Sequence, residues 1–75
     1  MYVIEENKLN DSDKYAKGEF LVGYYKPNGG FCAEGEFKWE WSSELSCNKE
    51  KYRESAQDEA IAFCTRLNGM KLFPY

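Results

Sequence analysis

The feature that most constrains the fold is a strict alternation along residues 31–41, which run Phe-Cys-Ala-Glu-Gly-Glu-Phe-Lys-Trp-Glu-Trp. Successive side chains of a β-strand point to opposite faces, so this pattern predicts a strand with one aromatic face and one polar face. The preceding residues 27–30, Pro-Asn-Gly-Gly, are typical of a turn, because proline presets φ and Asn-Gly tolerates positive φ. We therefore expect a hairpin of residues 17–26 and 31–42.

The register of this hairpin follows from the turn and from the charges. We pair Lys26 with Phe31 across the four turn residues. The opposed pairs are then Phe20 with Phe37, Val22 with Gly35, Tyr24 with Ala33, Glu19 with Lys38, and Lys17 with Glu40. The last two pairs are attractive, whereas a shift of two residues would set Glu19 against Glu40. The aromatic face is therefore predicted to be the core face of the sheet.

The C-terminal third predicts one helix, because the apolar residues that follow residue 55 fall on one stripe. They are Ala56, Ala60, Phe63, Cys64 and Leu67. Ser55 is the preferred N-cap, and Asn68-Gly69 is the expected stop. A start near Asn48 stays open, since Tyr52 would lie on the same stripe. We favour residues 51–54 as a short strand or extended arm.

The remaining segments predict short outer elements. Residues 2–6 have the apolar start of a first strand, and residues 7–14 are polar and are expected to be a loop. Residues 70–73 predict a last strand that Pro74 closes. The expected fold is one α+β domain over residues 1–75, an antiparallel sheet of four to five strands with one C-terminal helix on its aromatic face and a short last strand.

Size and charge limit the possible partners. A chain of 75 residues buries a thin core and gains from aromatic packing, a partner or self-association. Its net charge of −3 gives no general attraction to a phosphate backbone, so a basic protein surface is a better expected partner than nucleic acid. We expect a cytoplasmic protein without membrane contact, because no segment resembles a signal peptide or a membrane span.

No residue pattern predicts catalysis, a cofactor or a metal. The chain has no histidine, the commonest general base. Glu34, Glu36 and Glu40 share one strand face, where exposed carboxylates are ordinary. The three cysteines, Cys32, Cys47 and Cys64, lie too far apart in sequence for a zinc motif and are expected to be free thiols, although one disulfide stays open. We expect a protein that is not an enzyme.

The polar face of the hairpin holds the candidate binding site. Leu21, Tyr25 and Cys32 are expected to form an apolar cluster there, beside Glu34 and Glu36. An apolar centre with a charged rim is the usual arrangement of a protein-binding patch. Trp41 joins these candidates, because a helix of about 14 residues, roughly 20 Å long, would leave it uncovered near the strand end.

Residues 52–69, Tyr-Arg-Glu-Ser-Ala-Gln-Asp-Glu-Ala-Ile-Ala-Phe-Cys-Thr-Arg-Leu-Asn-Gly, resemble a pattern in small phage and mobile-element proteins. In those proteins a strand enters a capped Ser-x-x-acid-x-Ala helix and a final strand follows. Anti-CRISPR proteins and the small phage inhibitor of bacterial RNA polymerase are similar in size and organisation. The resemblance implies a protein that blocks a larger host complex by occupying its surface.

The leading hypothesis is therefore a non-enzymatic, phage-encoded inhibitor or adaptor that binds a larger protein or ribonucleoprotein complex with a basic surface. Two alternatives stay open. One is a single-stranded nucleic-acid binder that uses exposed aromatic side chains. The other is a self-associating subunit, a homodimer in which the outer faces of two hairpins pack together.

Overall fold

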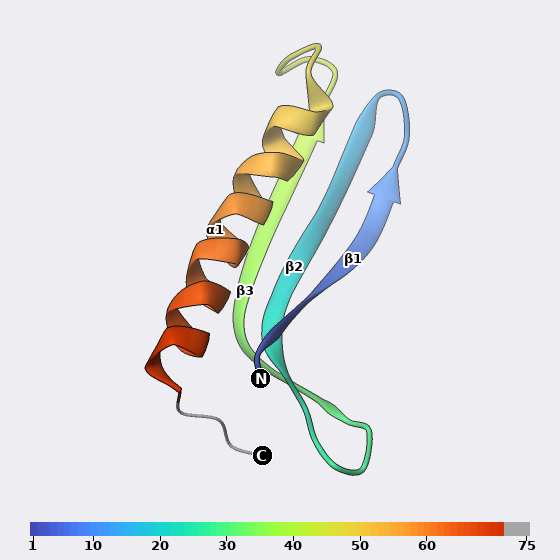
Figure 1. Cartoon of the computed structure of the whole chain (residues 1–75). Coiled ribbons are helices and arrows are strands. Elements are labelled where there is room, and N and C mark those ends of the chain that lie inside the picture. The colour runs from blue at the N-terminus through green and yellow to red at the C-terminus, as the bar shows by residue number, and fades with distance from the viewer. Residues whose placement is uncertain (72–75) are drawn as a thin grey trace.

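A computed structural model describes residues 1–71 as three strands followed by one helix (Figure 1). β1 (Val3–Asp11), β2 (Tyr15–Tyr25) and β3 (Phe31–Ser42) form an antiparallel sheet in that order. α1 (Lys49–Met70) runs antiparallel to β3 along one face of the sheet. The α+β class and the C-terminal helix are confirmed, whereas the expected four to five strands are three within residues 1–71.

β1 is longer than expected, because the polar residues 7–11 continue the strand instead of forming a loop. The strand pairs with β2 as far as Asp11 opposite Ala16, with one irregularity at Leu9. Ser12 closes the turn, since its hydroxyl donates to the Tyr15 carbonyl at 2.7 Å and accepts from the Tyr15 N–H at 3.0 Å. Backbone pairing along a sheet edge requires no apolar side chains, and composition alone therefore misplaced the end of this strand.

The predicted β2–β3 register is confirmed from the Lys17–Glu40 pair to the Val22–Gly35 pair. Beyond that point a β-bulge changes it, because Glu34 has no partner and Gly23 lies opposite Ala33. The loop is also longer than predicted, with the Lys26 N–H donating to the Gly30 carbonyl at 2.7 Å. The bulge displaces every pair between itself and the loop by one residue, so the predicted pairing of Tyr24 with Ala33 is wrong.

α1 begins at Lys49, so the extended arm at residues 51–54 is wrong and the earlier start is correct. Asn48 is the N-cap, and its side chain accepts a hydrogen bond from the Lys51 N–H at 3.3 Å. The helix continues past Gly69 to Met70, and Lys71 adopts the left-handed cap conformation with a φ of 56°. Residues 70 and 71 are therefore not a strand, and the rest of the predicted last strand lies outside the described residues.

The core lies between α1 and the sheet face formed by β2 and β3, and Tyr2, just before β1, completes it. The buried cluster consists of Tyr2, Phe20, Val22, Ala56, Ala60 and Cys64. Phe20 and Val22 are covered almost completely, whereas Phe37 and Trp39 on β3 are half-buried. The predicted aromatic face of the hairpin is thus the core face, and its β3 side is the less completely covered part.

Candidate functional site

The sheet face opposite α1, called the outer face here, is covered by no element of residues 1–71. Apolar side chains gather at the end of this face near the β2–β3 loop. We call Val3, Leu21, Tyr25 and Phe31 the outer patch. Tyr25 is 53% exposed, and its ring meets that of Phe31 edge-on at 5.1 Å between centroids. The patch therefore presents aromatic and aliphatic surface to solvent.

Acidic side chains surround the outer patch. Leu21 is paired with Glu5 on one side and with Glu36 on the other, so the strand register places a carboxylate on either side of it. Farther along the face, Glu19 accepts a hydrogen bond from the Asn7 side-chain amide at 3.2 Å and lies opposite Lys38. Lys38 also lies 3.9 Å from the Glu36 carboxylate, so Glu36 is partly balanced, and Glu5 and Glu34 supply the other acidic side chains near the outer patch.

Four of the six candidate residues named from the sequence lie on or beside this patch. Leu21 and Tyr25 belong to it, Glu36 borders it, and Glu34 is the exposed extra residue of the bulge. Cys32 does not belong, because the bulge moves it opposite Tyr24, a residue packed against the core. Phe31 lies opposite Tyr25, where continuation of the predicted register past the Tyr24–Ala33 pair would place Cys32.

Trp41, the sixth candidate, is buried and only 5% exposed. α1 is about 33 Å long rather than roughly 20 Å, because it starts at Lys49, and it therefore reaches the end of β3. The Trp41 indole N–H donates to the Ser46 carbonyl at 3.0 Å, and the Lys49 ammonium lies 5.8 Å from the ring centroid. The premise that this side chain is uncovered is wrong, and we remove it from the candidate binding surface.

Sequence reasoning missed three residues of this surface. Val3 and Glu5 reach it only through the pairing of β1 with β2, which no charge or turn signal in the sequence specified. Phe31 reaches it only through the bulge. One signal was present, since a glycine inside a strand, Gly23, often marks a bulge or a close approach of another backbone.

A second feature is a groove of about 420 Å³ between α1 and the free edge of β3. Its lining includes Lys38, Trp39 and Glu40 from the strand and Lys51, Ser55 and Glu59 from the helix. Trp39 also lies across Gly18, where a Cβ would come within 2.9 Å of the indole nitrogen. That nitrogen is buried and has no hydrogen-bond partner among residues 1–71. The groove is therefore lined by the Trp39 ring together with charged side chains from both elements.

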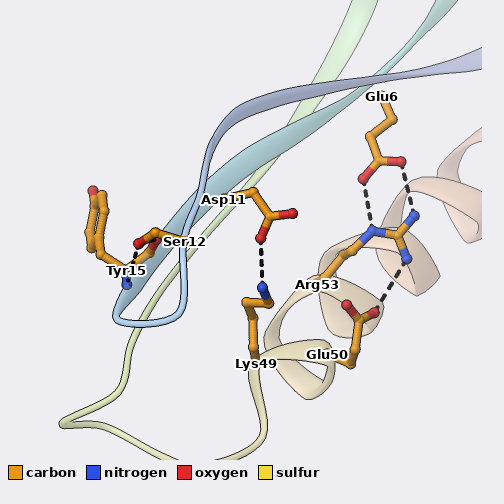
Figure 2. Close-up of polar contacts among 7 residues, drawn as sticks. All are labelled: Glu6, Asp11, Ser12, Tyr15, Lys49, Glu50 and Arg53. Carbon is orange, nitrogen blue, oxygen red and sulfur yellow. Dashed lines mark hydrogen bonds and ion pairs between the residues drawn. The ribbon is translucent and has the colours of Figure 1, made fainter.

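Ion pairs join β1 to α1 on the core side of the sheet (Figure 2). Arg53 donates two hydrogen bonds to the Glu6 carboxylate, at 2.8 and 2.9 Å, and lies 3.7 Å from Glu50. Lys49 contacts Asp11 at 2.6 Å. Hydrogen bonds from these cations lower the pKa of Glu6 and of Asp11. All these groups are engaged with one another, so we assign them to holding α1 on the sheet and not to binding.

We expect Glu6→Gln to lower the free energy of unfolding by about 1 kcal/mol near neutral pH, because it removes a bidentate ion pair. The pKa of Glu6 lies below its ordinary value of 4.5 in the folded chain. Its contribution is therefore complete above that pH and is lost as the pH falls through the folded-state pKa. Urea titrations of both chains should give a stability difference that is constant near neutral pH and shrinks in acid. A difference that persists unchanged at about pH 3 would contradict this assignment.

The cysteines and carboxylates of the described part of the chain form no disulfide and no metal-binding cluster. Cys32, Cys47 and Cys64 are free thiols, half-buried, exposed and buried in that order. Cys64 contacts the Tyr2 carbonyl at 3.4 Å and packs in the core. No group of three or more Cys, Asp and Glu side chains within residues 1–71 is arranged to hold a metal ion.

Comparisons with known proteins identify no relative. The chain matches no protein-family model, no curated protein and no solved structure. Over residues 1–71, the helix lacks the length of apolar sequence that crossing a bilayer requires.

Proposed function

We propose that the chain is a non-enzymatic protein-binding inhibitor or adaptor that docks its outer patch on a basic surface of a larger protein or ribonucleoprotein complex. The observation that carries this proposal is the uncovered outer patch, where Leu21 lies between Glu5 and Glu36 and the exposed Tyr25 packs on Phe31. Tyrosine and other aromatic side chains supply affinity at the centre of an interface. Carboxylates at its rim speed encounter with a basic partner and exclude acidic ones.

The test compares the wild-type chain with the double variant Leu21→Lys/Tyr25→Ala as bait in a bacterial cell lysate, with mass spectrometry of the retained proteins. The matched control is Ile61→Lys, which introduces the same charge at an apolar helix residue that is 46% exposed and lies away from the outer patch. We expect the wild type and the control to retain the same proteins and the double variant to lose them. The purified target should bind the double variant at least about tenfold more weakly.

Two further measurements discriminate among the alternatives. Binding to the purified target should weaken as salt is raised, because rim carboxylates steer a basic partner. A fluorescently labelled thymidine oligonucleotide at low salt should remain unbound. Saturable, salt-sensitive binding of that oligonucleotide would instead favour the single-stranded nucleic-acid hypothesis. Retention of the same target by the Leu21→Lys/Tyr25→Ala variant would remove the outer patch from the proposal.

A further inference from the structure

The free edge of β3 is the most extended unpaired feature of the described fold. β3 is 12 residues long, lies at the edge of the sheet and contains no proline. An edge strand exposes unpaired N–H and C=O groups that can pair with another strand. β3 carries its bulge near the loop, so the portion from Glu36 to Ser42 is regular and follows β2 without interruption. This portion is suited to pairing with a further strand.

The charges beside this edge have a two-fold pattern. On β3, Lys38 and Glu40 flank Trp39, and on α1, Lys51 and Glu59 flank Ser55. Both triplets line the same groove. α1 runs antiparallel to β3, so the Lys51 end of the helix stripe lies at the Glu40 end of the strand triplet. Two copies of the strand triplet that run in opposite directions therefore place a lysine opposite a glutamate at both ends. The same holds for two copies of the helix triplet.

The geometry points to a second copy of this chain as the partner that pairs with the free edge of β3 beside the groove. In this homodimer, β3 pairs antiparallel with β3 of the other copy about a two-fold axis through Trp39. Lys38 then lies opposite Glu40 of the second copy, and Glu40 lies opposite its Lys38. The two halves of a two-fold interface are identical, so each attractive pair occurs twice.

The neighbouring registers are less favourable. An axis through Lys38 sets that residue against its own copy and Glu36 against Glu40. An axis through Phe37 pairs Glu36 with Lys38 but extends the pairing into the bulge, where the acidic Glu34 approaches Glu40. Opposed like charges on adjacent strands are destabilising. In all these registers, the core faces of both sheets lie on the same side of the joined sheet. Among them, the axis through Trp39 opposes no like charges.

The helices fit the same axis. α1 covers the fully buried Phe20 of β2 and leaves Trp39 of β3 half-buried, so it lies above the boundary between these strands. With strands about 4.8 Å apart, the two-fold copy of α1 then lies about 10 Å away, a normal distance for packed helices. Lys51 faces Glu59 of the other copy across Ser55. The half-buried Tyr52 beside Trp39 adds apolar surface to this contact.

Sedimentation equilibrium of the full chain over about 1 µM to 1 mM tests this dimer. We expect reversible dimerisation, and Lys38→Glu or Glu40→Lys alone should raise the dissociation constant about tenfold. An equimolar mixture of these two variants should regain dimers, because the first variant is acidic at both positions, the second is basic at both, and every opposed pair is then attractive. A chain that stays monomeric throughout overturns the proposal, as does a mixture that dimerises no better than its components.

The helix contact has its own charge-swap test. Glu59→Lys should weaken dimerisation, and Lys51→Glu/Glu59→Lys should restore it to within about threefold of the wild type. Glu54→Lys is the matched control, since it makes the same charge change on an exposed part of α1 that does not line the groove. Circular dichroism establishes that each variant is folded. A dimer that Leu21→Lys/Tyr25→Ala abolishes would place the interface on the outer face and overturn the edge pairing.

Discussion

We expect Gly23→Ala to lower the free energy of unfolding by about 3 kcal/mol or more and to leave much of the chain unfolded at room temperature. A Cβ at this position would overlap the Cys32 carbonyl oxygen and would lie 2.9 Å from the Ala33 Cα. Both contacts are with backbone atoms, so no side-chain rotation can relieve them. The bulge must open, and the pairs between Gly23 and the loop must separate with it.

Urea denaturation followed by circular dichroism measures this effect. Gly69→Ala is the matched control, because it makes the same chemical change inside α1, where a Cβ meets nothing within 4 Å. Alanine is a better helix former than glycine by about 1 kcal/mol, so the control should be slightly more stable than the wild type. Equal midpoints for the wild type and Gly23→Ala would mean that the Cys32 carbonyl does not occupy the space over Gly23.

The sequence predicted the part of the hairpin that side chains specify. Alternation and charge determined the pairs from Lys17–Glu40 to Val22–Gly35, and all of them are present. The bulge could not be predicted from the side-chain pattern, because it changes backbone hydrogen bonding and the length of the loop but leaves the apolar pattern of β3 intact. Gly23, a glycine inside β2, was a sequence signal for it. Because of this one-residue displacement, Phe31 lies in the candidate site and Cys32 does not.

The helix boundaries illustrate a competition between two N-caps. Ser55 followed by Asp58 has the composition of a helix start, but Asn48, which follows the turn at residues 43–45, caps Lys51 directly. Tertiary contact decides between them, since the turns added by the earlier start bring Arg53 to Glu6 and Lys49 to Asp11. No local signal in residues 48–55 encodes partners that lie on β1.

The edge dimer and the outer patch would act together. Pairing of β3 with its copy would produce a six-stranded antiparallel sheet with both helices on one face. The opposite face would then carry two copies of the outer patch, related by the two-fold axis. A partner with two basic sites at matching spacing would bind both patches, and the second contact would be intramolecular. The charge-swap variants of β3 should then weaken binding to such a partner even though they leave the outer patch intact.

Trp41→Ala should lower the free energy of unfolding by about 3–5 kcal/mol, because it empties the space between β3 and the first turn of α1. Trp41 is 5% exposed, and its N–H bond to Ser46 holds the connection between the two elements. Trp41→Phe retains most of the ring and loses this hydrogen bond, so about 1–2 kcal/mol is expected. Urea denaturation of the three chains gives both values.

The Trp41 variants also distinguish a structural role of this side chain from a role in binding the target. Loss of the target by Trp41→Ala should follow the unfolded fraction, and Trp41→Phe should bind normally wherever it is folded. Tyr25→Ala should show the opposite behaviour, with weaker binding and a midpoint close to that of the wild type, since Tyr25 is exposed. A Trp41→Phe chain that is fully folded yet loses the target would return this residue to the binding surface. It would also require the first turn of α1 to separate from β3 in the complex, because the indole is otherwise covered.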